Sequence, residues 1–235
     1  MNLKDAYKFA SADFMAYSRP NSYELVGKGI DLAFDSGRKT TLTLAFAAES
    51  RTALTVTLSG GLNDQPAACL KIGGGIFLVN FAIDNFGATY ILDYAAGLAT
   101  HVVIGGDKPM EDFGYIVGAA ADERARHALS DDLIGNTVDY SFSPTITASV
   151  KYTKDNAGIT MPMMPPIAIP GFKAIRLAEG IYFQYGQIAL GPTKVGLFLV
   201  GDYNSVLFDG ALFGVPGLPP LGTIGGYGKV TAYQE

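Results

Sequence analysis

The chain contains two copies of one pattern, and this repeat restricts its fold more than any other feature. Glu24–Phe34 reads Glu-Leu-Val-Gly-Lys-Gly-Ile-Asp-Leu-Ala-Phe, and Asp132–Phe142 repeats its acid, Leu, Gly, Asp and Phe in the same order. Cys69–Asn80 matches Ala174–Tyr185 in a similar way. The two pairs are offset by about 108 and about 105 residues, and chance does not explain such similar offsets at separate places. The sequence therefore predicts two tandem units of one architecture.

Within the first copy, hydrophobic residues alternate with a period of two. Thr40–Phe46 and Thr52–Leu58 each place Leu and Val side chains on one face and Thr on the other. Asp35–Gly37 reads as a hairpin turn between strands. Ile76–Ile83 is apolar on both faces, so we expect it to be covered on both sides. About six or seven short strands in about 80 residues are typical of an antiparallel barrel or sandwich.

A helical spacing of apolar residues precedes each copy. Residues 3–17 and 110–129 show it, and 122–127 reads as a charged, solvated helical face that places His127 at the surface. We therefore expect two domains, residues 1–109 and 110–235, each a helix followed by an antiparallel β-barrel. The alternative is one large barrel to which each copy gives half of the strands.

Composition narrows the function classes. Of the 235 residues, 49% are hydrophobic and 17% charged, which excludes disorder for most of the chain. The net charge of −5 argues against nucleic-acid binding. One cysteine allows no intrachain disulfide, which favours a cytoplasmic location, and two histidines with one cysteine predict no structural zinc site. The sequence contains no run of about 18 apolar residues, so it predicts no membrane-spanning helix. We also expect no cofactor.

Two segments of the second copy are apolar and rich in proline. Residues 160–171 and 213–222 cannot form central strands, because proline lacks the backbone N–H. Apolar loops of this kind cover a cavity as a lid or form a subunit contact more often than they pack inertly. We expect a lid or pocket wall, with a homodimer contact as the alternative.

Three motifs occur at Leu25–Gly37, Lys71–Phe81 and Thr89–Val103. Together they resemble the MoaF-like family, and the repeat extends this resemblance over both copies. It implies a mainly β fold of two tandem lipocalin-like (calycin) antiparallel barrels with short flanking helices. Phenolic acid decarboxylases are distant relatives of similar shape, but their catalytic residues do not map onto this sequence. Nothing here supplies a set of molybdenum ligands.

Candidate catalytic residues stand out as polar groups on apolar strands. His101 lies among Ala99 and Val103, where an imidazole could move a proton at a cavity wall. Asp93 precedes the Ala95–Gly97 turn, and a carboxylate inside a barrel could act as acid or base. A hydrogen-bonded structural histidine and an exposed aspartate at a strand end are the alternatives.

Five further residues are candidates for substrate binding. Tyrosine, glutamine and asparagine can orient a substrate by hydrogen bonds, and an arginine can pair with a carboxylate. Tyr182 and Gln184 share one strand face, whereas Tyr185 points the other way. These candidates are Tyr182, Gln184, Tyr185, Asn80 and Arg176. The alternative for the tyrosines, the glutamine and the asparagine is a core polar group whose hydrogen bonds are made within the protein. For Arg176 it is an exposed charge at the end of a strand.

Three functions fit these features. The first is a cofactor-independent isomerase, cyclase or lyase that uses acid–base groups on a hydrophobic, including an aromatic, small molecule in a barrel cavity. The second is a non-catalytic carrier or sensor of such a molecule. The third is an interaction protein whose proline-rich loops form the interface. The first two need the same apolar pocket with a few polar groups.

Overall fold

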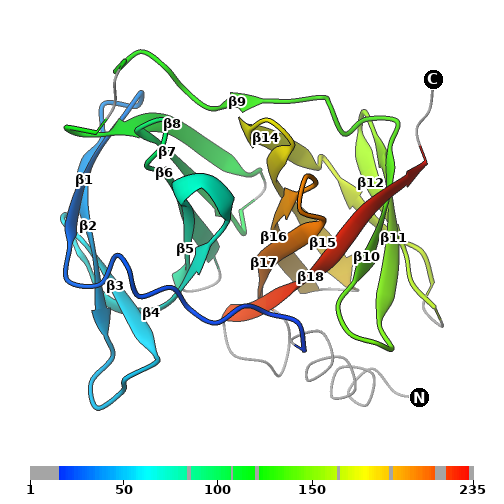
Figure 1. Ribbon diagram of the computed structural model, residues 1–235, viewed down its shortest axis with the longest axis horizontal. Coiled ribbons are helices and arrows are strands. Elements are labelled where there is room, and N and C mark those ends of the chain that lie inside the picture. The colour runs from blue at the N-terminus through cyan, green and yellow to red at the C-terminus, as the bar shows by residue number, and fades with distance from the viewer. Residues whose placement is uncertain are drawn as a thin grey trace. The chain divides into compact units, whose positions relative to one another are not determined.

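The protein is mainly β and is built from two tandem antiparallel sheets, as predicted (Figure 1). The structure, a computed structural model, describes residues 16–83, 86–106, 108–119, 122–162, 165–190, 193–214 and 221–232. The chain divides into two compact units: Pro20–His127, and residues 128–235 together with residues 16–19.

The first unit is a closed barrel in which consecutive strands are antiparallel neighbours. Its strands are β1(Gly29–Phe34), β2(Lys39–Phe46), β3(Leu54–Leu58), β4(Leu62–Lys71), β5(Ile76–Ile83), β6(Phe86–Asp93), β7(Leu98–Ile104) and β8(Met110–Ile116). β1 pairs with β8 and closes the barrel. β5 pairs with β4 and β6, both in this half. The first copy therefore forms a barrel of its own, and the single large barrel is excluded.

The helix predicted over residues 110–129 is wrong. Residues 110–116 are β8, which pairs with both β1 and β7. Gly114 lies where β8 crosses β1, and a Cβ at this glycine would overlap the carbonyl oxygen of Ala33. Two ladders of hydrogen bonds and this close approach outweigh a local apolar spacing that also suits a helix. The other predicted helix, over residues 3–17, lies almost entirely outside the described residues.

Large apolar side chains fill the interior of the first barrel. Residues on alternate positions of all eight strands contribute, and each is at most 9% exposed. Members include Leu32, Leu42, Val56, Cys69, Phe77, Phe81, Tyr90 and Leu92. This interior is a packed core, as expected for a small barrel whose inward residues interdigitate.

The second unit is one curled sheet of ten strands. These are β9(Ala128–Leu129), β10(Thr137–Ser141), β11(Thr147–Thr153), β12(Asn156–Thr160), β13(Ile167–Pro170), β14(Lys173–Ala178), β15(Ile181–Leu190), β16(Thr193–Asp202), β17(Leu207–Phe213) and β18(Leu221–Ala232). Their order is β13-β12-β11-β10-β18-β17-β16-β15-β14-β9. β10 pairs with β18 just as β1 pairs with β8, so the sequence repeat is also a repeat of topology.

The two halves differ at one strand. β4 is a continuous strand that pairs with both β3 and β5. In the second half the equivalent stretch is broken by Pro170 and Gly171 into β13 and β14, which do not pair with each other. Gly171 has a φ of 65°, a left-handed conformation that glycine adopts without strain. The second sheet therefore stays open between these two strands.

The edge strand β13 still packs against the sheet across this opening. Ile169 lies on Gly186 of β15 so closely that a Cβ at Gly186 would overlap the Ile169 Cγ2 methyl group. The predicted loop 160–171 thus ends in an edge strand, where proline is tolerated. Residues 163–164 of this loop and 215–220 of the other lie outside the described residues.

Candidate functional site

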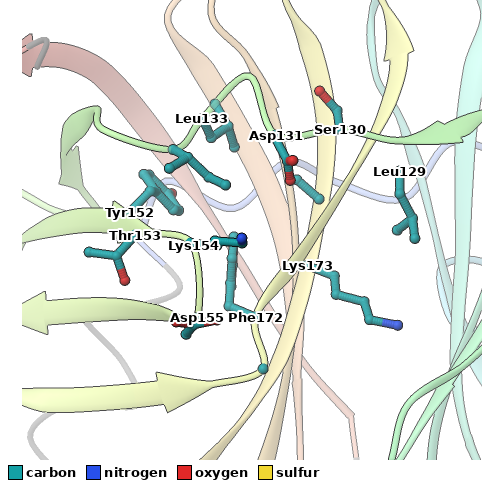
Figure 2. A pocket seen from close by; sticks show the side chains of 13 residues that line it. Leu129, Ser130, Asp131, Leu133, Tyr152, Thr153, Lys154, Asp155, Phe172 and Lys173 are labelled. Carbon is teal, nitrogen blue, oxygen red and sulfur yellow. The ribbon is translucent and has the colours of Figure 1, made fainter. Parts of the chain in front are cut away.

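A pocket of about 480 Å³ opens beside the break between β13 and β14 (Figure 2). Three segments form it: residues 129–134 after β9, the β11–β12 turn at 152–155, and the β13–β14 turn at 171–174. The backbone N–H of Gly171 donates to the carbonyl of Asp155 at 3.1 Å, which ties the two turns together. The end of the predicted lid segment 160–171 thus contributes to a pocket wall.

The pocket has an apolar wall that continues to its rim. Leu133 and Ala174 are buried, and the ring of Phe172 packs against Tyr152 with centroids 5.2 Å apart. Leu129 and Ile134 also line it, although they are 53% and 38% exposed. An apolar surface that extends from the core to solvent is typical of a ligand-binding hollow.

Charged groups of both signs stand at the same pocket. Lys154 and Lys173 line it together with Asp131 and Asp155 (Figure 2). Asp131, Lys154 and Asp155 are exposed, whereas Lys173 begins β14 and is half-buried. Long charged side chains of this kind keep their charged ends in water while their stems cover apolar surface. The pocket therefore offers hydrophobic contact and charged partners to the same ligand.

A closed ring of hydrogen bonds lies behind Tyr152, in the core of the second half. Tyr140 Oη is 2.7 Å from Tyr152 Oη and 2.9 Å from Tyr203 Oη. Gln184 completes the ring, since Tyr152 donates to its Oε1 at 2.6 Å and its Nε2 donates to Tyr203 Oη at 2.8 Å. Every member has two partners, so the ring meets the requirement that buried polar groups be hydrogen-bonded.

Burial keeps the tyrosines of this ring neutral. It raises the pKa of Tyr140, and it raises the pKa of Tyr152 and Tyr203 well above the ordinary value of 10.0. Gln184, predicted to bind substrate, is 1% exposed, and both polar atoms of its amide form hydrogen bonds within the ring. The sequence patterns did not single out these three tyrosines, although the alternation in Val138–Tyr140 and Val150–Tyr152 is that of inward strand positions for two of them.

Two other predicted substrate residues meet at a carboxylate. Tyr182 Oη donates to Asp132 Oδ2 at 2.8 Å, and Arg176 Nη1 lies 3.6 Å from the same oxygen. The hydrogen bond from Tyr182 is the main cause that lowers the pKa of Asp132. Tyr182 packs on the core that surrounds Gln184, whereas Tyr185 lies on the opposite face of β15. Tyr182 and Gln184 thus share the inner face, and Tyr185 does not.

In the first barrel, His101 faces the interior beside an arginine. Its ring stacks on that of Tyr90 at 4.3 Å, and its Nδ1 lies 2.9 Å from Arg38 Nη2. Burial, with a smaller contribution from the Arg38 charge, lowers the pKa of His101 to about 3. The imidazole is therefore neutral at physiological pH and accepts a hydrogen bond from Arg38 at Nδ1.

Asp93 lies on the opposite face of the sheet from His101. Its Oδ1 accepts hydrogen bonds from the backbone N–H groups of Ala95 and Ala96 at 2.9 and 3.0 Å. Burial opposes ionisation, but these bonds and the His127 ring outweigh it, so the pKa of Asp93 is lowered. Asp93 lies at the end of β6 and binds the following turn, but it is only 3% exposed, so it is not the exposed aspartate of the alternative interpretation.

His127 is not the surface residue that the sequence analysis expected. It is 4% exposed, its Nδ1 is 2.9 Å from Thr100 Oγ1, and its Nε2 is 3.6 Å from Asp93 Oδ2. The expectation failed because it rested on a helix that does not form. Asn80 lies on the same outer face and is fully buried, and its amide has no hydrogen-bond partner among the described residues.

The structure therefore does not bring the predicted catalytic groups together, because His101 and Asp93 face opposite sides of one sheet. Among the described residues no three His, Cys, Asp or Glu side chains cluster as metal ligands would. The described part of the chain also has no helix of the length and apolarity that a membrane crossing requires. No protein-family model matches this sequence, and no curated protein matches it.

Proposed function

We propose that this protein binds a hydrophobic small molecule in the pocket of its second half, as a carrier or sensor. The observation that carries this proposal is the apolar lining that reaches solvent through Leu129 and Ile134. Exposed large apolar side chains around a hollow favour a ligand that covers them. The volume of about 480 Å³ lies in the range of small-molecule sites, roughly 300–1,000 Å³.

The charges at the pocket favour a ligand with a polar group on a hydrophobic body. Lys154 is exposed and has no partner among the described residues, so a ligand oxygen can pair with it at little desolvation cost. Phe172 and Tyr152 line the pocket with aromatic side chains that suit an aromatic or aliphatic body. The preferred ligand is therefore amphipathic, with its apolar part against the rings.

The predicted isomerase, cyclase or lyase activity remains a prediction. It requires an acid and a base within reach of one substrate, and His101 and Asp93 lie on opposite sheet faces. Binding needs only the pocket, so we place it first. Membership of the MoaF-like family, a cytoplasmic location and a homodimer likewise remain predictions drawn from the sequence.

A fluorescent reporter in the pocket wall tests the binding proposal. The chain has no tryptophan, so Phe172→Trp introduces a single one in the lining. We expect energy transfer from this tryptophan to anilinonaphthalene sulfonate, an apolar anionic dye, with saturable dye fluorescence. In the natural sequence the dye should bind with the same stoichiometry, detected by its own emission.

Variants at the rim of the pocket test whether the dye binds there. Ile134→Glu and Leu129→Glu place a carboxylate on exposed positions at the pocket, where folding tolerates it, and should weaken dye binding about ten-fold. Met110→Glu is the matched control, because Met110 is 63% exposed on a strand of the first barrel. Equal binding by all three variants, or no saturable binding at all, would refute the proposal.

A further inference from the structure

An arginine, a tyrosine and a histidine form a second polar cluster, which extends from the core of the first barrel to a partly exposed arginine. We call Arg38, Tyr90 and His101 the arginine cluster. Arg38 follows the turn between β1 and β2, and its guanidinium carbon lies 4.6 Å from the ring centre of Phe34 and 5.7 Å from that of Tyr90. Tyr90 and His101 are directly opposed on β6 and β7 and are stacked. The guanidinium is thus bordered by aromatic rings.

Two buried donors of this cluster are unused. Arg38 Nε and Tyr90 Oη have no partner with full hydrogen-bond geometry among the described residues, although the Arg38 guanidinium lies close enough to the Tyr90 hydroxyl to oppose the rise in its pKa that burial causes. Tyr90 is 0% exposed. Leaving a buried donor unpaired costs about 1–3 kcal/mol. His101 adds a third donor, because its Nδ1 accepts from Arg38 and the neutral ring then carries its proton on Nε2. The cluster therefore presents N–H and O–H groups that an acceptor would satisfy.

The charge of Arg38 is only partly neutralised. Its Nη2 lies 3.7 Å from Asp112 Oδ2, longer than the roughly 2.7–2.9 Å of a charge-assisted hydrogen bond. Asp112 instead accepts from Ser36, through the hydroxyl at 2.6 Å and the backbone N–H at 3.2 Å. Arg38 is 37% exposed along its side chain, although its Nε is buried, so a solute meets the outer part of the side chain first. An anionic oxygen is thus a better partner for the unused donors than a neutral one.

We propose that the arginine cluster binds the carboxylate of a small organic acid, with Arg38 Nε–H and Tyr90 O–H donating to its oxygens. A planar carboxylate fits the edge of a guanidinium and can accept two hydrogen bonds at once. The neighbouring rings restrict the acid to a small one. This site is separate from the pocket of the second half, and neither proposal depends on the other.

Histidine NMR on the full chain tests the proposal directly. The chain has two histidines, so ¹⁵N-histidine labelling gives two ring systems, which His101→Asn assigns. We expect sodium formate and sodium acetate to shift the His101 ring resonances saturably and to leave those of His127 in place. Sodium chloride and sodium sulfate at equal ionic strength are the arms that test for inorganic anions. Shifts that do not saturate, or equal shifts by chloride, would overturn the carboxylate site.

Variants of Tyr90 and Arg38 test which side chains donate hydrogen bonds to the carboxylate. Tyr90→Phe keeps the ring and removes the hydroxyl, and it should weaken acetate binding about ten-fold. Arg38→Lys keeps the charge but loses Nε–H and should weaken binding further. Lys39→Gln removes a charge from the exposed next residue and should leave binding unchanged. If Arg38→Lys does not fold, Tyr90→Phe decides, and unchanged acetate affinity in that variant would refute the donor assignment.

Discussion

Acid should destabilise the first barrel through His101 in a way that His101→Asn removes. The folded barrel holds the pKa of His101 at about 3, against an ordinary value of 6.5, because the ring is buried beside the Arg38 guanidinium. Between about pH 6.5 and about pH 3 the unfolded chain binds a proton at this histidine, whereas the folded barrel does not. Stability therefore falls as the pH drops from about 6.5 toward about 3.

The size of the effect follows from the shift. At about pH 4.5, two units below the unfolded pKa, the loss is at most about 2.7 kcal/mol, since each unit is worth about 1.36 kcal/mol. Water and salt reach Arg38 and weaken its repulsion, while Asp112 opposes it, so we expect roughly 2 kcal/mol. Tyr90, whose ring stacks on that of His101, stays neutral because burial raises its pKa. Asn keeps an oxygen acceptor near the position of Nδ1 and does not titrate.

The only cysteine provides an assay specific to this barrel. Cys69 is 0% exposed in its core, and burial raises the pKa of its thiol to about 12, so it reacts when the barrel opens. Labelling with a dipyridyl disulfide, which also reacts in acid, gives the free energy of opening across a urea series. The natural protein should lose stability relative to His101→Asn between about pH 6.5 and 4.5. A stability difference independent of pH would refute the assignment.

Three further predictions concern the second half. Gln184→Met should cost about 1–3 kcal/mol in urea unfolding, because it leaves two buried tyrosine hydroxyls short of a partner. Gly186→Ala should destabilise by about 1–3 kcal/mol and by clearly less in an Ile169→Ala background; additive effects would contradict the close contact. Burial raises the pKa of Asp209 to about 6, and Arg19 offsets this only in part. The folded protein therefore keeps the Asp209 proton at a pH where the unfolded chain has lost it, so the stability of Asp209→Asn should rise by up to about 3 kcal/mol relative to the natural protein between about pH 4 and about pH 6. Parallel pH profiles of the two proteins would argue against this shift.

Local patterns in the sequence were enough for the fold class. The alternation in Thr40–Phe46 became β2, and Ile76–Ile83 became β5 with six of its eight residues buried. The repeat predicted two units, and the equivalent pairings of β1 with β8 and of β10 with β18 confirm it. These features are readable because strand periodicity and turn residues act over a few neighbouring positions. Local patterns fail at residues 110–116, where strand pairing with β1 and β7 overrides a helical spacing.

The sites were decided by tertiary structure. The tyrosine–glutamine ring joins three different strands and the turn after β16, and the arginine cluster joins Arg38 to residues more than fifty positions later. The alternation of side chains along the paired strands β6 and β7 places His101 inside the barrel and Asp93 outside it. A strand break at Pro170 and Gly171 leaves the second sheet open beside its pocket. Such groupings depend on register and closure between distant segments, which a local pattern of residue types does not encode.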